Sequence, residues 1–423
     1  MGFQRAVLSI DGGGIKGIVP AMILAKIEEE TQKPICQLFD LIAGTSTGGI
    51  LTLGLTKPSE KDRTKPKFTA KQLVDLYVKQ GKIIFQGREP EKSNFDNNII
   101  NIVKELGNLY IEQGKGIFQG RELEKSNFDN AKENLLKAIL NKFLPQIEAE
   151  DLFSSKHSRK GKKKVINDYL KDTYMKEALA EILITSYSTN FRKPIFFTSN
   201  SQKEEEYKTS KLYRVICEGY TMENAALATS AAPTYFKPYW VDAINHPDKG
   251  YTLVDGGVFA NNPTSIAIIE AMNSYKAKKG KNIPLDELLV VSLGTGRKAR
   301  GLDIDEIANW GQIKWIEPLI DITLNGQSEV VDYQMEQLLS AKLQRSIQEQ
   351  QYYRFQPQYS EIKNSKHYSM GENDLIYVND KMDDASTDNI DNLVEASQRF
   401  INKEIYNLKR LSNELSKIVR SDL

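Results

Sequence analysis

The chain has 423 residues, 40% of them hydrophobic, so it can bury a large core and is neither a disordered tail nor a small disulfide scaffold. Its 57 Lys and Arg nearly balance its 56 Asp and Glu, leaving a formal charge of +1, which argues against a protein built to coat nucleic acid. The two cysteines, Cys36 and Cys217, lack metal-ligand spacing, and we expect unpaired thiols in a reducing compartment.

The N-terminal residues carry no recognisable targeting signal. The opening MGFQRAVLSI lacks the long apolar segment of a signal peptide, and Ala6 stands where the myristoylation pattern requires Ser or Thr. No apolar run reaches the ~18 residues of a membrane span. We therefore expect a soluble, cytoplasmic protein.

Short apolar runs alternate with helical segments along the chain. The run Ala6–Ile10 ends at Asp-Gly-Gly-Gly and precedes a helix predicted over Pro20–Glu30; Phe39–Ala43 precedes a helix predicted over Ile50–Leu55. Further predicted strands are Ile182–Tyr187, Ile195–Thr198, Tyr251–Val254 and Leu288–Leu293, and another helix begins near Thr264. Repeated strand–turn–helix units indicate a layered α/β fold with a largely parallel sheet.

Three stretches depart from this alternation. The segment 71–97 recurs as 104–130, and two copies are too few for a solenoid, so we interpret them as a tandem duplication within a surface insertion. The basic run 156–164 (KHSRKGKKK) is expected to form an exposed loop, either simply solvated or attracted to anionic lipid head groups. The spacing over 390–415 predicts a helix, which the polar residues 383–386 would cap.

Ser46 is the first candidate for chemistry. It lies in Gly44-Thr45-Ser46-Thr47-Gly48, between a predicted strand and a predicted helix, the context in which a G-x-S-x-G turn exposes a nucleophilic serine. The supporting glycines Gly44 and Gly48 would let strand and helix approach closely. The alternative is an ordinary glycine-rich turn in which Ser46 caps the helix.

A serine nucleophile needs a base, and the usual histidine has no obvious candidate. The chain has three histidines, His157, His246 and His367, and none directly ends a convincing predicted strand. Asp255 does, since it follows the apolar run Tyr251–Val254 and precedes Gly256 and Gly257. A water-poor pocket would raise its basicity enough to accept a proton from Ser46. The alternative is an Asp-Gly turn residue.

The third motif is Asp11-Gly12-Gly13-Gly14-Ile15-Lys16-Gly17, again between a strand and a helix. As a G-x-G-x-x-G dinucleotide fingerprint it lacks an acidic residue after a second strand, which weakens an oxidoreductase interpretation. The same loop would serve as an oxyanion hole, with the unhindered amides of Gly13 and Gly14 as donors. Lys16 would add positive potential or hold the loop.

Together, these motifs resemble those of the patatin-like acyl hydrolase family. The similarity continues through three further segments, residues 228–236 (ATSAAPTYF), 292–296 (SLGTG) and 382–386 (MDDAS), and so covers most of the chain. The resemblance implies a three-layer α/β/α fold in one domain, 1–423, with a duplicated insertion at about 71–136 and a helical C-terminal extension at about 385–423.

The resemblance also implies an activity. It implies a Ser46–Asp255 dyad without histidine, an oxyanion hole formed by the backbone of Gly12, Gly13 and Gly14, and hydrolysis of fatty-acyl esters in glycerolipids through an acyl-enzyme. It implies no cofactor and no metal or calcium requirement. The partner that it implies is a glycerolipid or membrane-lipid substrate, which the protein reaches by transient contact with a membrane surface. The oligomeric state is not predicted.

Two alternatives remain open within the same family. Bacterial relatives act as anti-phage effectors that cyclic nucleotides switch on, and the sequence has no feature that we can tie to such a pocket. The other alternative is an inactive lipid-binding or storage protein. The presence of both dyad residues, Ser46 and Asp255, argues against it.

Overall fold

The computed structural model describes residues 2–87, 155–206, 210–244, 246–297, 301–308, 310, 312–340, 350–359, 378–379 and 381–419. The chain divides into two compact units, one formed by 1–86 with 159–423 and the other by 87–158. In the second unit, Gly87 and His157 form an antiparallel bridge. The second copy of the sequence repeat, 104–130, lies outside the described residues.

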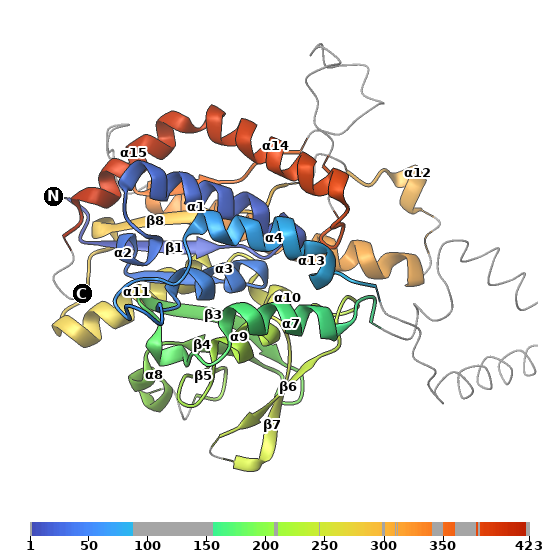
Figure 1. Cartoon of the computed structure of the whole chain (residues 1–423), viewed down its shortest axis with the longest axis horizontal. Helices are drawn as coiled ribbons and strands as arrows, with labels where there is room; N and C mark the ends of the chain where they lie inside the picture. Colours follow the sequence, from blue (N-terminus) through green and yellow to red (C-terminus); the bar gives the residue numbers. More distant parts are fainter. Residues whose placement is uncertain are drawn as a thin grey trace, which may run out of the picture. The chain divides into compact units, whose positions relative to one another are not determined.

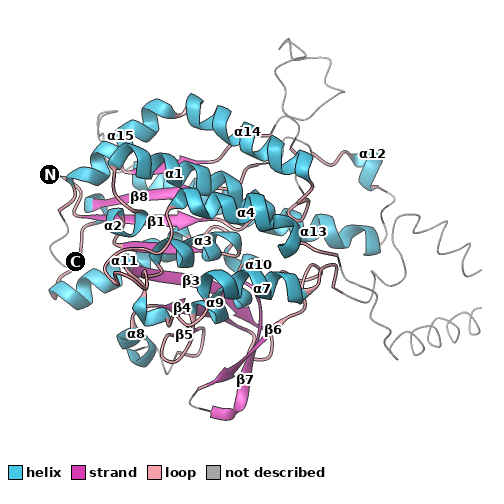
Figure 2. Cartoon of the chain, in the orientation of Figure 1, coloured by secondary structure: helices cyan, strands magenta, loops and turns pink. Residues whose placement is uncertain are grey.

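One mixed sheet organises the first unit. Its main path has the order β5-β4-β3-β2-β1-β8-β9, with β7 paired to β3 and β6 paired to β7. The strands are β1 (Arg5–Ile10), β2 (Leu41–Gly44), β3 (Glu181–Ser188), β4 (Lys193–Thr198), β5 (Arg214–Ile216), β6 (Tyr239–Ala243), β7 (His246–Asp255), β8 (Leu288–Leu293) and β9 (Tyr352–Phe355). All neighbours from β3 through β2, β1 and β8 to β9 run parallel (Figure 2), which confirms the predicted largely parallel sheet.

Helices cover both faces of this sheet, and Figure 1 shows their arrangement. The helices longer than one turn are α1 (Ile18–Thr31), α3 (Thr47–Thr56), α4 (Ala70–Ile84), α7 (Arg159–Leu170), α8 (Ser201–Glu206), α9 (Met222–Thr229), α11 (Thr264–Lys279), α13 (Gln312–Ser340), α14 (Thr387–Lys403) and α15 (Ile405–Lys417). Single turns are α2 (Ile35–Leu38), α10 (Gly257–Ala260), α12 (Ile304–Ile307), η1 (Gly14–Gly17), η2 (Met175–Glu177) and η3 (Leu285–Glu287). The three-layer α/β/α arrangement is therefore confirmed.

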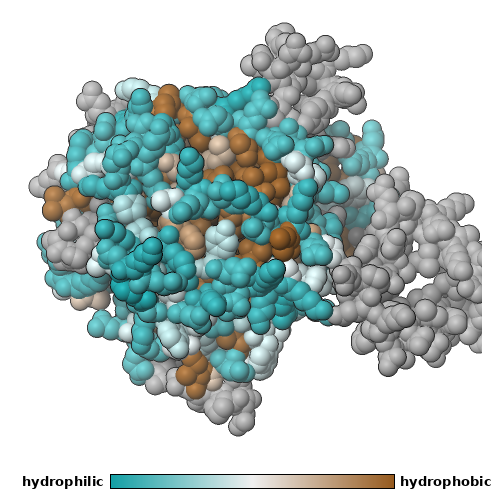
Figure 3. Space-filling model, viewed as in Figure 1, coloured by the Kyte–Doolittle hydropathy of each residue, from teal (hydrophilic) through white to brown (hydrophobic). Residues whose placement is uncertain are grey.

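Alternation along β1 explains why the sheet is covered on both sides. Leu8 and Ile10 join the large cluster that includes α1, α3, α4, α14 and α15, whereas Val7 packs with Ala267 and Ala271 of α11 on the other face. Successive side chains of a strand point to opposite faces, so a fully apolar run such as β1 requires helices on both. On the face shown in Figure 3, hydrophilic residues dominate and apolar ones form patches among them.

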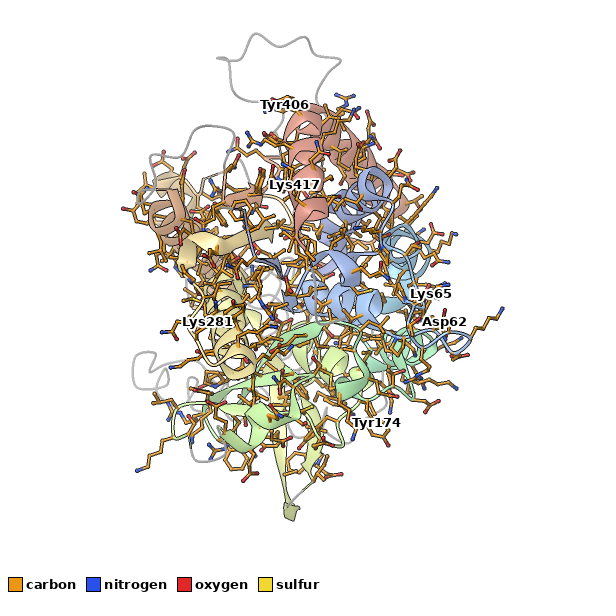
Figure 4. All side chains as sticks on the ribbon, turned by 90° about the vertical axis from the view of Figure 1, so that its left-hand side faces the viewer. Asp62, Lys65, Tyr174, Lys281, Tyr406 and Lys417 are labelled. Atoms are coloured by element: carbon orange, nitrogen blue, oxygen red, sulfur yellow. The ribbon has the colours of Figure 1, made fainter. Side chains whose placement is uncertain are left out.

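The C-terminal segment is part of the core. The predicted helix over 390–415 is two helices, α14 and α15, that meet at Glu404, and Ser386 caps α14 by accepting a hydrogen bond from the Asn389 amide. Leu408 and Leu411 of α15 are fully buried in the large cluster, whereas Tyr406 is 75% exposed and lies at the outer surface (Figure 4). The segment therefore stabilises the body instead of extending from it.

The predicted insertion at about 71–136 needs one correction. Its first residues, 71–84, belong to α4, which packs on α1 and buries Leu73, Leu76 and Tyr77 in the core. The reason is an amphipathic helix with a capping box at Thr69, whose apolar face needs a partner. The boundary of the second unit is at Gly87.

Two further observations concern the cysteines and the hydrophobicity of the helices. Cys36 and Cys217 are both buried and unpaired. No helix in the described ranges is long and apolar enough to cross a bilayer.

Candidate active site

Ser46 lies on a sharp turn between β2 and α3. Its φ of 54° is in the left-handed region, which non-glycine residues rarely adopt. The Ser46 amide donates to Thr229 Oγ1 at 2.8 Å, and the Ser46 carbonyl accepts from the Ile50 amide at 3.0 Å. Its hydroxyl makes no capping hydrogen bond to α3, so the alternative of a merely capping serine is wrong.

The sheet brings Asp255 to Ser46 by an unexpected route. β2 runs parallel to β3 and ends where Gly44 pairs with Ile184. β7 runs antiparallel to β3, and Asp255, its last residue, pairs with Ser186. Both partners lie on β3 only two positions apart, so β2 and β7 approach each other end to end. The sequence predicted a largely parallel sheet, and β7 is an exception to it, because β7 arrives from the opposite direction through the β6–β7 hairpin.

The two side chains meet in a buried place. The Ser46 side chain lies close enough to the Asp255 carboxylate to favour its ionised form, and the Gly257 amide donates to Asp255 Oδ1 at 2.8 Å. Asp255 is 5% exposed, and burial raises its pKa to about 6 although Ser46, Gly257 and the charge of Lys162 oppose the rise. Asp255 is therefore a residue of an Asp-Gly turn, as one interpretation of the sequence held. Its carboxylate also has a basicity suited to accepting a proton near neutral pH.

Of the three histidines, the structure describes the side chain of His157 alone, and His157 belongs to the second unit. The side chain of His246 and the whole of His367 lie outside the described residues. Among the described residues, the titratable group that Ser46 acts on is the carboxylate of Asp255.

The glycine loop passes directly beside Ser46. A Cβ added at Gly12 would lie 3.2 Å from Ser46 Cβ, and Gly14 has a φ of +62° with the Met382 carbonyl only 2.0 Å from where its Cβ would stand. The Gly12 amide donates to the Asn261 carbonyl at 3.1 Å, which leaves it unavailable as an oxyanion donor. No hydrogen bond within the described part of the chain uses the amides of Gly13 and Gly14.

Two contacts that the sequence did not suggest hold this loop. Arg354 of β9 binds the Asp11 carboxylate with both terminal guanidinium nitrogens, at 3.0 and 2.6 Å; the Asp11 side chain is 2% exposed and that of Arg354 is 10% exposed. Burial raises the pKa of Asp11, and the Arg354 charge opposes that rise. Thr295 donates to the Gly12 carbonyl at 3.0 Å. The edge strand β9, which the sequence analysis missed, therefore anchors the loop.

The other predicted supporting residues are also at the site. A Cβ at Gly44 would lie 2.3 Å from the Gly48 carbonyl, so β2 and α3 approach as closely as expected. Gly256 packs against the Thr185 main chain, and Gly257 supplies the amide bound by Asp255. The Lys16 side chain is buried within η1.

The basic run 156–164 is wrongly predicted as an exposed loop. From Arg159 onward it forms α7, and Lys162 is only 2% exposed. Its Nζ donates to the Ser230 carbonyl at 2.8 Å and lies 3.6 Å from the centroid of the Phe236 ring. A signal was available, since Lys162, Val165 and Ile166 share one helical face.

Comparisons with known proteins show the family to which this sequence is related. A family model described as patatin-like phospholipase matches residues 8–268. The chain is 29% identical to "Patatin-like protein 2" of Arabidopsis thaliana over 79% of this chain and 72% of that protein. It is 28% identical to "Patatin-2-Kuras 4" of Solanum tuberosum, covering 96% of this chain and 88% of the potato protein.

The name of one relative describes it as inactive. A third relative, named "Probable inactive patatin-3-Kuras 1" of Solanum tuberosum, is 27% identical over 96% of this chain and 88% of its own length. The family relationship thus supports lipid acyl hydrolysis in general terms. Any more specific mechanism has to be argued from the side chains at the site. On the extent of the family match, this chain belongs to the patatin-like phospholipase family.

Proposed function

We propose that this protein hydrolyses the fatty-acyl esters of glycerolipids, with Ser46 as nucleophile and Asp255 as general base. The observation that carries the proposal is the buried Asp255 carboxylate beside Ser46, which stands on its strained turn and favours the ionised form of that carboxylate. A hydroxyl becomes a competent nucleophile when an adjacent base removes its proton as it attacks.

In the proposed reaction, Asp255 takes the Ser46 proton while the serine oxygen attacks the ester carbonyl. The negative charge that develops on the carbonyl oxygen is bound by the amides of Gly13 and Gly14, near the N-terminus of α1. The tetrahedral intermediate expels the alcohol, which receives the proton from Asp255. Water, deprotonated by the same carboxylate, then attacks the acyl-enzyme. As the second intermediate collapses, Asp255 returns that proton to the Ser46 oxygen, which frees Ser46 and the fatty acid.

Water exclusion supports this assignment of roles. An ionised carboxylate in water is a weak base, whereas burial raises the pKa of Asp255 to about 6. The left-handed backbone conformation of Ser46 accompanies a side chain that makes no capping hydrogen bond to α3, so its oxygen is free to act with the carboxylate. The lipid class and the position of the cleaved ester are left to experiment.

Fatty-acid release from mixed phospholipid, galactolipid and triacylglycerol micelles tests the proposal. We expect release by the wild type and loss of at least about three orders of magnitude in Ser46→Ala, as for other serine nucleophiles. Ser201→Ala, an exposed serine at the start of α8, is the matched control and should keep full activity. Equal release by wild type and Ser46→Ala would refute the mechanism.

A fluorophosphonate probe separates an active enzyme from an inactive storage protein. We expect one covalent adduct on the wild type, mapped to Ser46 by mass spectrometry and missing from Ser46→Ala. A parallel arm with added cyclic dinucleotides tests activation by such molecules. Absence of labelling in both arms would favour the inactive alternative.

A further inference from the structure

Lys162 is a buried cation without a role in the mechanism above. Lysine is seldom fully buried, because taking its ammonium out of water is costly unless a partner compensates. Here the ammonium has a backbone carbonyl, Ser230 at 2.8 Å, and the face of Phe236. The next two residues of α7, Lys163 and Lys164, are exposed as lysines usually are.

The carbonyl that Lys162 binds belongs to a turn that touches both dyad residues. Thr229 Oγ1 accepts from the Ser46 amide at 2.8 Å, and the Ala231 carbonyl accepts from the Asp255 amide at 3.0 Å. Ser230 stands between these two contacts. Three consecutive residues therefore connect the nucleophile, the buried ammonium and the base.

The ammonium and the carboxylate also act on each other electrostatically. The charge of Lys162 lowers the pKa of Asp255, against the larger effect of burial. Burial lowers the pKa of Lys162 to about 7, Asp255 opposes this decrease, and Arg159 on the same helix adds to it. Because the two charges interact, their titrations are coupled.

Few other charged groups face Lys162 among the described residues. The small cavity beside it is lined by apolar side chains from α3 and α4, namely Ile50, Leu73, Leu76 and Ile84, and by α7 residues that include one titratable group, the phenol of Tyr169. The α9 turn contributes a carbonyl, and β7 contributes Asp255. The charges that act on Lys162 are thus one carboxylate and one guanidinium.

Building on the proposed function, we propose that Lys162 is a positioning residue that keeps Asp255 ionised, and so able to accept the Ser46 proton, at neutral pH. Its ammonium also holds the turn at 229–231 against the two dyad residues. The arrangement is a compromise, since an uncompensated buried carboxylate would be a stronger base but would remain protonated at the working pH.

The test compares Lys162→Met, Lys162→Arg and the control Lys163→Met, using kcat/KM for a soluble short-chain ester between pH 5 and pH 9. Methionine keeps length and apolar contact but removes the charge. The fall in kcat/KM at acidic pH should occur about 1 pH unit higher in Lys162→Met than in the wild type, which is the low end of the effect of a nearby opposite charge on a pKa. At pH 6 this gives a loss of roughly fivefold that disappears above pH 8. Lys162→Arg should stay near the wild-type limb, and Lys163→Met should coincide with it.

A second measurement reads Asp255 without catalysis. The infrared carbonyl band of the protonated Asp255 carboxyl is obtained by subtracting the spectrum of Asp255→Asn in the same background. In Lys162→Met this band should disappear at a higher pH than it does in the wild type. Circular dichroism checks that each variant is folded, and Lys162→Gln replaces Lys162→Met if the latter is not.

The outcomes separate the two proposals. A rate loss in Lys162→Met that is equal at every pH, with an unmoved Asp255 band, would overturn the role of Lys162 and leave a purely structural contact. Equal hydrolysis by wild type and Ser46→Ala would instead overturn the proposed function, while the infrared titration would still decide whether Lys162 controls Asp255.

Discussion

Replacing Asp255 with asparagine should abolish hydrolysis and stabilise the fold at neutral pH. The carboxyl titrates near 3.8 in the unfolded chain and, because of burial, at about 6 in the folded protein. Between these values the unfolded chain is ionised first, so the wild type loses stability as pH rises through this window. At 1.36 kcal/mol per unit, the loss amounts to about 3 kcal/mol at pH 7, and asparagine does not incur it.

Urea unfolding followed by circular dichroism at pH 4.5, 5.5 and 7 measures this difference. We expect the variant's advantage over the wild type to grow across the series towards about 3 kcal/mol. Asp75→Asn is the matched control, because Asp75 is a half-exposed carboxylate paired with Lys79 on α4, and its replacement should change stability by less than about 1 kcal/mol. A variant whose advantage is the same at pH 4.5 and pH 7 would show that the Asp255 carboxylate carries no burial cost.

Two further substitutions test the anchoring of the glycine loop. Arg354→Met leaves the Asp11 carboxylate buried without its counter-charge, so the free energy of unfolding in urea should fall by about 3–5 kcal/mol and recover in large part in the Asp11→Asn/Arg354→Met double variant; a double variant no more stable than the single one would contradict this. Gly14→Ala forces a side chain onto a backbone with φ +62° and into a neighbouring carbonyl, so both the melting temperature and fatty-acid release should fall, and unchanged activity would argue against a function for this loop geometry.

Much of the fold was predictable because its signals are local. The apolar runs of β1, β2, β3 and β8 each fill a strand, and glycine-rich segments follow β1, β2 and β8, so strand order along the chain could be read directly. Ser46 and Asp255 were predictable for a similar reason, since Ser46 lies two residues after β2 and Asp255 follows the apolar run Tyr251–Val254.

What could not be predicted depends on contacts between distant segments. The direction of β7 is set by its hairpin with β6, and no local pattern distinguishes a strand that runs parallel from one that runs antiparallel. β9 is only four residues long and follows a polar stretch, yet it carries Arg354, which meets Asp11 across 343 positions of sequence. The burial of Lys162 was not predicted, because the many basic residues around it suggested an exposed loop. Its spacing relative to Val165 and Ile166, which places all three on one face of a helix, was not considered.

The site combines several features that oppose folding, and its surroundings explain how they persist. Ser46 has a left-handed backbone conformation that costs about 1–3 kcal/mol, and Asp255 is a carboxylate held where burial disfavours its charge. Neither residue is held only by its own strand, since the turn at 229–231 binds the main-chain amide of each. That turn ends α9, whose Ala225, Ala226 and Leu227 are buried in the large core cluster. Core packing therefore fixes the turn, and the turn holds the main chains of Ser46 and Asp255 beside each other, which is the arrangement that the proposed proton transfer requires.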